Sequence, residues 1–197
     1  MPRAQPRRDH LIETARRLFN AHGYHQTGID LIMKESGVSK TTMYKYFPTK
    51  EDLIAEVLSR RSDELYEAGR AAAQASMVEL PDAPRHHHYW ALFASTEAWT
   101  RSADFCGCMF MKAASEYARD DDPVRLRAAA HKARMEALVA DLLCDLDPTG
   151  TLAAHIMLVV EGAVMTAFNR RDANAMAHAR TIIAMMIAQV DGASAAA

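Results

Sequence analysis

The stretch "TGIDLIMKESGVSKTTMYKYF", Thr27 to Phe47, decides the fold of this chain. Its apolar residues recur at helical spacing on both sides of Gly37, which predicts two short helices joined by a tight turn. Glycine permits backbone conformations that other residues resist, so the two helices can cross steeply. Thr27, with Asp30 three residues on, is expected to cap the first helix, and Ser39 to cap the second. The pattern is that of a helix-turn-helix, with a small core formed by Ile32, Val38 and Met43.

The second helix of this motif is expected to bind nucleic acid through its exposed side. Hydrogen-bonding, aromatic and cationic groups suit base edges, thymine methyl groups and phosphates. The candidate residues are Lys40, Thr41, Thr42, Tyr44, Lys45 and Tyr46. Thr27 lies where a helix N-terminus can hold a phosphate, and Lys50 opens the following helix beside the expected groove. The alternative is that the tyrosines pack in the core and the lysines only face solvent.

Helices are predicted on both sides of the motif and through the rest of the chain. A first helix ends at Gly23. A long one begins at Lys50 after Pro48 and Thr49, with Thr49 expected to cap it and Asp52 in its third position. No Asn-Gly or Asp-Gly pair separates alternating apolar runs, which argues against β-hairpins. We therefore expect an all-α protein: a helix-turn-helix domain over 1–55, with 1–8 as a flexible basic arm, and a helical domain over 56–197. Further helices are expected over 84–100, 106–119, 123–146, 152–169 and 174–190.

Charge and cysteine content bound the environment of the protein. Residues 1–61 contain eleven Lys or Arg and seven Asp or Glu, a net charge of +4, whereas the remainder contains twelve and eighteen, a net charge of −6. A basic segment on an acidic remainder suggests a polyanion partner for that segment.

Three cysteines, an odd number, argue for a reducing compartment. The charged start is unlike a signal peptide, and the apolar run 156–168 is expected to be too short to span a membrane, so a cytoplasmic protein is predicted.

Residues of about 9–58 resemble the N-terminal domain of the tetracycline-repressor (TetR) family of bacterial transcription regulators. The matching residues are Ala15 with "LF" in the first helix, "GYHQTGI" at 23–29 and "GVSKTTMYKYFPTKEDL" at 37–53. The resemblance implies a helix-turn-helix domain on a helical domain that binds ligand and dimerises. It also implies that a homodimer binds a near-palindromic double-stranded DNA operator and leaves it when a small-molecule effector binds, as a repressor does.

The same resemblance suggests roles for single residues. It places Thr27 and Lys50 on the DNA backbone, and Thr42, Tyr44 and Tyr46 on backbone or bases. The chain departs from the family pattern in three places. Gly28 stands where Ser or Thr is usual, Tyr46 where His is common, and Lys45 where an aromatic residue or Arg is frequent. These departures make the base preference unreadable from the sequence.

The C-terminal part carries a shorter resemblance. "FCGCMFMKAASE", 105–116, is similar to a "GC-x-F-x-x-A-A-x-E" segment in one branch of these regulators. The last two helices are those the family uses for dimerisation. The apolar stripe on the final helix suits a buried core and a dimer face equally well, and consists of Ile182, Met185, Met186 and Val190.

An effector pocket is expected among aromatic, methionine and polar residues of the C-terminal helices. The candidates are Phe93, Glu97, Trp99, Phe110, Lys112, His131 and Met135. Each of them also suits plain core or surface, because burial cannot be read from the sequence.

Cysteines and histidines raise the alternative of a thiol- or metal-responsive regulator. Cys106 and Cys108 stand one residue apart, and His86–His88 are consecutive. Three consecutive histidines on a helix cannot face one ion, because neighbours point about 100° apart. We expect no metal and no cofactor.

An enzyme is a more distant alternative, since no nucleophile elbow, P-loop or paired-carboxylate motif is present. A helix-turn-helix protein that shapes DNA without a ligand is a third.

Overall fold

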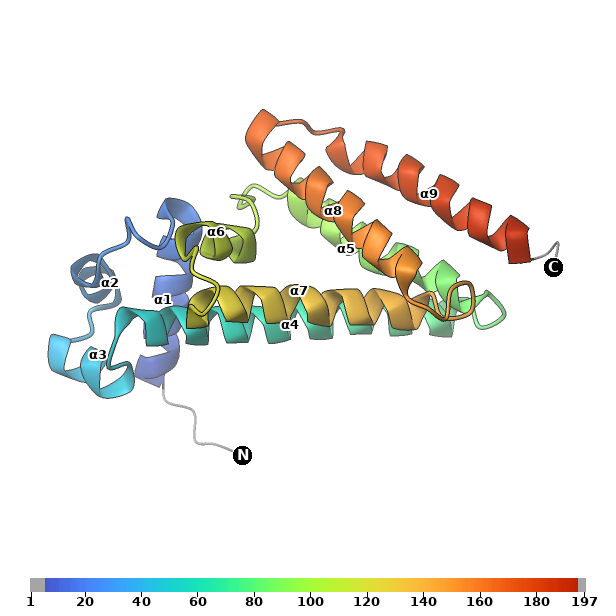
Figure 1. Cartoon of the computed structure of the whole chain (residues 1–197). Coiled ribbons are helices and arrows are strands. Elements are labelled where there is room, and N and C mark those ends of the chain that lie inside the picture. The colour runs from blue at the N-terminus through green and yellow to red at the C-terminus, as the bar shows by residue number, and fades with distance from the viewer. Residues whose placement is uncertain (1–5, 195–197) are drawn as a thin grey trace. The chain divides into compact units, whose positions relative to one another are not determined.

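The computed structural model describes residues 6–194, and all regular secondary structure in that range is helical (Figure 1). The all-α prediction is therefore confirmed. A 3-10 turn, η1 (Arg85–His88), precedes the fifth α-helix. The α-helices are α1 (Pro6–His22), α2 (Ile29–Ser36), α3 (Lys40–Tyr46), α4 (Lys50–Glu79), α5 (Tyr89–Thr100), α6 (Met109–Glu116), α7 (Pro123–Leu142), α8 (Thr151–Arg170) and α9 (Ala175–Ser194).

The described chain forms two compact units, here called the head unit and the body unit. The head unit contains the described residues up to Asp63 together with Cys108–His131. The body unit contains Glu64–Gly107 and the described residues from Lys132 onward. The head unit therefore includes α6 and the first part of α7, residues that the sequence analysis assigned to a second domain beginning at 56.

The head unit is built on the apolar face of α1. Leu11, Ala15, Leu18 and Phe19 lie at helical spacing and are all buried. The expected core of the helix-turn-helix is confirmed, because Ile32, Val38 and Met43 are 0%, 8% and 0% exposed. The first turns of α4 complete this core with Leu53, Ile54, Val57 and Leu58.

Local capping fixes where the head helices begin and end. Gly37 ends α2 in the left-handed conformation at φ 65°, as its place in the turn predicts. The Ser39 hydroxyl accepts a hydrogen bond from the Thr42 amide at 3.3 Å and caps α3. Thr49 and Asp52 cap α4 reciprocally: the Thr49 amide donates to Asp52 Oδ2 at 3.0 Å, and the Asp52 amide donates to Thr49 Oγ1 at 3.1 Å. These three predictions are confirmed.

Two sequence predictions about the head unit are wrong. The N-cap of α2 is Gly28, which makes no side-chain cap, so the expected cap by Thr27 does not form. Residues 6–8, expected in a flexible arm, form the first turn of α1. The rest of that arm, residues 1–5 with Arg3, lies outside the described residues.

An ion-pair network ties the first turns of α1 to α4. Arg8 Nη1 and Arg60 Nε each donate to Glu56 Oε1 at 3.0 Å, and Arg60 Nη2 donates to Asp9 Oδ1 at 2.7 Å. The Arg8 guanidinium also lies over the Phe47 ring, 5.0 Å from its centroid. Burial alone would raise the pKa of Glu56, but the hydrogen bonds from Arg8 and Arg60 outweigh it and lower the pKa below its ordinary value.

Glu56→Gln is expected to destabilise the protein by about 1 kcal/mol at neutral pH, the upper range for exposed ion pairs, because two arginines share one carboxylate. Since the folded pKa is lowered, this stabilisation is present above the unfolded pKa of Glu and disappears as pH falls through the folded pKa. The difference from wild type in urea unfolding should therefore be constant near neutrality and shrink in acid. Glu67→Gln, at the exposed pair with Arg70, is the control with little effect expected. A difference that grew in acid would contradict this account.

The body unit contains the helical hairpin of α8 and α9, which run antiparallel (Figure 1). Ile156 from α8 and Ile183 from α9 are fully buried. By length and composition α8 could cross a membrane, so the apolar run within it is longer than the sequence analysis expected. One such helix is weak evidence for a membrane protein, because helices of soluble proteins pass the same test.

The turn before α6 also differs from expectation. Gly107 adopts φ +83°, and a Cβ placed there would lie 2.9 Å from the Phe168 ring, so glycine is required both by conformation and by space. The helix then begins at Met109, three residues later than predicted from the sequence, and ends at Glu116.

Candidate nucleic-acid interface

Helix α3 presents the predicted DNA-contacting residues on its outer side. Met43 and Phe47, 0% and 3% exposed, hold the helix to the head core. The remaining side chains face outward to different degrees: Lys40, Thr41, Tyr44 and Lys45 are exposed, and Thr42 and Tyr46 are half-buried. Tyr44 keeps 42% of its surface accessible, so it is not a core residue. The arrangement leaves cationic, hydroxyl and aromatic groups free to meet a groove.

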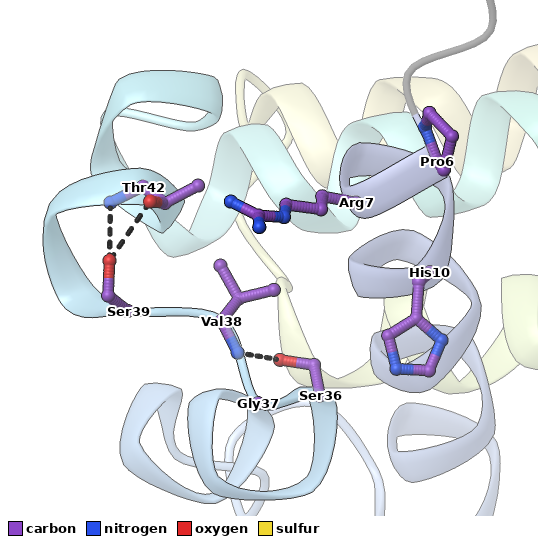
Figure 2. A pocket seen from close by; sticks show the side chains of 8 residues that line it. All are labelled: Pro6, Arg7, His10, Ser36, Gly37, Val38, Ser39 and Thr42. Atoms are coloured by element: carbon purple, nitrogen blue, oxygen red, sulfur yellow. Dashed lines mark hydrogen bonds between the residues drawn. The ribbon is translucent and has the colours of Figure 1, made fainter.

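The start of α3 borders a surface hollow that also includes the first turn of α1 (Figure 2). The Arg7 side chain extends toward Thr42, and His10 lies further along the same side of α1 (Figure 2). The sequence predicts Arg7 in a flexible arm, whereas in the structure Arg7 belongs to α1 and its side chain lies beside α3. The hollow is lined by Pro6, Arg7, His10, Ser36, Gly37, Val38, Ser39 and Thr42.

Thr27 does not offer its hydroxyl to DNA. It is 0% exposed, and its Oγ1 donates to the Gly23 carbonyl at 2.6 Å and lies 3.3 Å from the Leu18 carbonyl. The hydroxyl therefore fixes the turn between α1 and α2. The next residue, Gly28, is exposed, and no other atom lies within 4 Å of the place that a Cβ would occupy there. A backbone contact near residue 28 remains open to a phosphate, but the predicted side-chain contact of Thr27 is wrong.

Lys50 occupies the first position of α4, as the sequence predicts, and is half-buried. A cation at a helix N-terminus opposes the helix dipole. Glu51 and Asp52, which follow directly, compensate for it within the folded protein. The position nevertheless gives an anion both a lysine and a helix N-terminus, which is a common arrangement for binding a phosphate.

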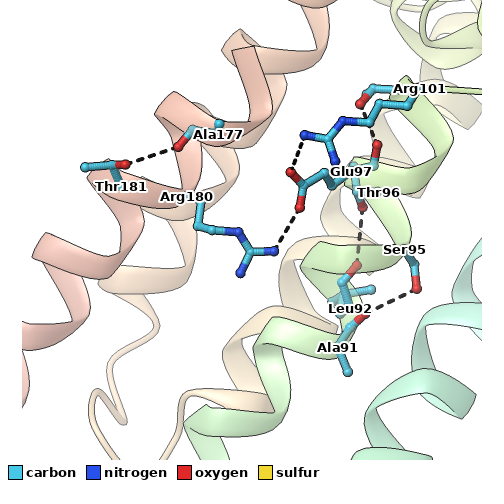
Figure 3. Close-up of polar contacts among 10 residues, drawn as sticks. Ala91, Leu92, Ser95, Thr96, Glu97, Arg101, Ala177, Arg180 and Thr181 are labelled. Atoms are coloured by element: carbon cyan, nitrogen blue, oxygen red, sulfur yellow. Dashed lines mark hydrogen bonds and ion pairs between the residues drawn. The ribbon is translucent and has the colours of Figure 1, made fainter. Parts of the chain in front are cut away.

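Four of the seven predicted effector residues lie in the body unit, and the one carboxylate among them is already paired. The Glu97 carboxylate pairs with Arg101 and Arg180, both at 2.9 Å (Figure 3). The hydrogen bond from Arg180, above all, lowers the pKa of Glu97. Arg180 also lies over the Phe93 ring, 4.8 Å from its centroid. The remaining two pack against apolar neighbours: Trp99 stands edge-on to Phe105, and Met135 lies beside Gly69.

The other three candidates lie in the head unit and make internal contacts. Phe110 is buried and stacks on the His131 ring at 3.6 Å between centroids. His131 Nδ1 lies 3.0 Å from the Ser62 hydroxyl. Lys112 Nζ donates to the Asn20 carbonyl at 2.8 Å. The seven candidates thus fall into two groups, and none of them lines the hollow beside α3.

The histidines and cysteines of the described residues make separate contacts in the structure. Among residues 6–194, no group of three or more His, Cys, Asp or Glu is placed to hold a metal ion. His86 Nδ1 pairs with Asp145 at 2.9 Å, and His88 Nδ1 lies 3.0 Å from the Ser76 hydroxyl. Cys106 and Cys108 are half-buried free thiols.

These features define the chain as an all-helical protein with an N-terminal helix-turn-helix motif. Comparison with known proteins gives the family. The model described as "Bacterial regulatory proteins, tetR family" matches residues 11–57, and that described as "Transcriptional regulator LmrA/YxaF-like, C-terminal domain" matches residues 91–182. The chain belongs to the TetR family.

Individual relatives agree with this assignment. The uncharacterized HTH-type transcriptional regulator YxaF of Bacillus subtilis is 45% identical over 53 residues, which are 26% of this chain and 28% of that protein. The HTH-type transcriptional activator FasR of Mycolicibacterium smegmatis is 39% identical over 72 residues, 36% of this chain and 32% of its own length. The chain thus matches about a third or less of these curated relatives. The crystal structure of SCO4454, a TetR-family transcriptional regulator from Streptomyces coelicolor, is 26% identical, with a TM-score of 0.73 over 94% of this chain and 87% of that one.

Proposed function

We propose that this protein is a DNA-binding transcriptional regulator that acts as a homodimeric repressor and is released from its operator by a small molecule. The observation that carries the proposal is the outer side of α3, where Tyr44, Lys45 and their polar neighbours are exposed while Met43 anchors the helix. Two such helices, one from each protomer, would enter successive major grooves about 34–36 Å apart. A regulator of this kind works where the DNA is, which supports the cytoplasmic location predicted from the sequence.

The backbone contacts are assigned to Lys50 and Arg7. Phosphate contacts fix register and orientation, whereas base contacts select sequence. Thr42 and Tyr44 are assigned to sequence selection, with Lys40, Thr41, Lys45 and Tyr46 beside them. Thr27 is withdrawn as a side-chain contact because its hydroxyl is buried.

Lys50→Ala is expected to weaken binding to all duplexes by a similar factor and to reduce the slope of log affinity against log salt by about 1. The reason is that a lysine on a phosphate releases a counterion whatever the base sequence. Fluorescence anisotropy over a salt series, on operator and random duplexes, measures both effects. Lys132→Ala is the matched control, since Lys132 pairs with Glu161 in the body unit. A wild-type protein with no salt-dependent affinity for any duplex would contradict DNA binding itself.

The dimer is assigned to the outer surface of α8 and α9. Only 22% of the most apolar stretch of α8 is buried within the chain, and Leu158 is 72% exposed. On α9, Ile182 and Met185 are 43% and 60% exposed. The sequence could not decide whether the stripe on α9 was core or dimer face. Its outward position supports the dimer face, because a second copy would remove this apolar surface from water.

The effector is assigned to the body unit, near Phe93, Glu97, Trp99 and Met135. The family model covering residues 91–182 describes a C-terminal domain of a transcriptional regulator, and the resemblance to the family implies that this domain binds the effector. Lys112, His131 and Phe110 are not included, since their contacts lie in the head unit. A melting-temperature screen of small molecules, followed by operator release with unchanged compound, tests the assignment. Turnover of a stabilising compound would instead favour an enzyme.

The sign of regulation needs its own test, because the relative FasR is named an activator. A reporter gene placed behind the selected operator decides the sign. Expression should fall when the protein is present and recover when the effector is added. Expression that rises with the protein would show an activator.

A further inference from the structure

Side chains of helix α6 form hydrogen bonds with backbone groups that are left unpaired where α1 ends. In a continuing helix, the Tyr24 amide would donate to the Asn20 carbonyl four residues earlier. Instead, the Tyr24 amide donates to Glu116 Oε1 at 2.9 Å, and Lys112 Nζ donates to the Asn20 carbonyl at 2.8 Å. Both halves of the missing backbone hydrogen bond are thus satisfied by charged side chains of α6, one turn apart.

The Glu116 carboxylate also holds the next amide in the chain. Its Oε2 accepts from the His25 backbone N–H at 2.5 Å. Two consecutive amides that point at one carboxylate form a strong anion-binding arrangement, and hydrogen bonds to a charged group are the stronger kind. Gly23 makes this possible: it adopts φ +83°, and a Cβ at that position would lie 2.8 Å from Glu116 Oε1.

Tyr24 provides a third connection between the turn and α6. It is 0% exposed, and its hydroxyl donates to the Met109 carbonyl at 3.0 Å. Burial raises the pKa of Tyr24, so the hydroxyl stays protonated and remains a donor. Met109, Lys112 and Glu116 are spaced so that they lie along one side of α6.

The held segment leads directly into the helix-turn-helix. The Gly23 carbonyl accepts the Thr27 hydroxyl at 2.6 Å, and Gly28 is the N-cap of α2. The path from α1 to α2 is therefore fixed by α6 at residues 23–25 and by Thr27 just before α2 begins. A change in the backbone course between α1 and α2 would rotate α2, and α3 with it, relative to α1.

We propose that Lys112 and Glu116 are positioning residues for DNA binding, which set the orientation of the helix-turn-helix without contacting the DNA. This inference rests on the proposed DNA-binding function and deepens it. It gives Lys112 a role different from the effector contact expected from the sequence. It also gives a physical reason for the Glu at the end of the "GC-x-F-x-x-A-A-x-E" segment in this chain.

The test compares operator affinity with stability in matched variants. Glu116→Ala and Lys112→Met should each lower operator affinity roughly 10-fold at a temperature where the protein is fully folded, since each removes charge-assisted hydrogen bonds. Lys112→Arg keeps a donor for the Asn20 carbonyl and should retain affinity. Leu143→Val, at a buried residue of the body unit, is the control, with the operator affinity of the wild type despite a lower Tm.

Glu116→Gln keeps the size of the side chain and one acceptor oxygen, so it covers the case in which Glu116→Ala folds poorly. Amide hydrogen exchange at Tyr24 and His25 should be slow in the wild type, faster in Glu116→Gln and fastest in Glu116→Ala. Operator affinity in these variants no lower than that of Leu143→Val would overturn the inference, as would unchanged exchange at both amides. A wild type that does not bind DNA would instead overturn the proposed function, so the two failures are distinct.

Discussion

Leu158→Arg is expected to make the protein monomeric and to lower its apparent operator affinity roughly 100-fold or more, the range that loss of a linked second site gives. Leu158 is 72% exposed on α8, a 20-residue helix that is long and apolar enough to span a membrane. In a monomer, arginine at this position would face water at little cost. In the proposed dimer it would bring a charge into an apolar interface, where burial without a partner is strongly unfavourable.

The matched control for this variant is Leu126→Arg. Leu126 is 54% exposed on α7 in the head unit, so the same substitution is made at a similarly exposed leucine away from α8 and α9. Sedimentation equilibrium measures the association state, and anisotropy measures operator affinity. Leu126→Arg should remain dimeric with wild-type affinity. A Leu158→Arg protein that is still a dimer and binds the operator like the wild type would rule out the α8–α9 interface.

Tyr44→Ala is expected to reduce operator affinity by about 10-fold or more while changing affinity for random duplexes far less. Tyr44 is 42% exposed on α3, and its neighbours Met43 and Phe47 hold the helix in place, so the truncation leaves the core intact. A residue that reads bases should affect discrimination, whereas a phosphate contact such as Lys50 should affect all duplexes alike.

Tyr44→Phe separates the two parts of the side chain. If the ring packs against a thymine methyl group, the phenylalanine variant should keep the preference; if the hydroxyl reads a base edge, it should lose it. Competition between operator and random duplexes measures the ratio directly. Equal losses for Tyr44→Ala on both duplexes would refute its assignment to sequence selection.

The helix-turn-helix was predictable because its determinants are local. Gly37, Ser39 and the Thr49–Asp52 pair act within a few residues of their own position, and the structure confirms each of them. Thr27 was misassigned because a threonine before a helix suits a cap, and only the left-handed turn at Gly23 shows that its hydroxyl faces inward. The sequence predicts that the helix ends at Gly23, but it does not show that the Thr27 hydroxyl, four residues later, binds the Gly23 carbonyl.

Contacts between distant parts of the sequence were not predictable from one chain. Glu116 and Tyr24 are 92 residues apart, and Arg180 and Glu97 are 83 residues apart. Such pairs decide whether a charged side chain is available to a ligand or is already neutralised. Glu97, which the sequence predicts in the effector pocket, is an example, because two arginines already hold its carboxylate.

The central claim, that the outer side of α3 reads DNA as part of a dimer, is tested most directly by selection of bound duplexes from a random pool with the full-length protein. The predicted result is one enriched motif made of two inverted half-sites whose centres lie about one helical turn apart. The Leu158→Arg protein should fail to enrich the paired motif, and Tyr44→Ala should enrich a different or weaker one. A wild-type pool that stays random after selection would contradict the account.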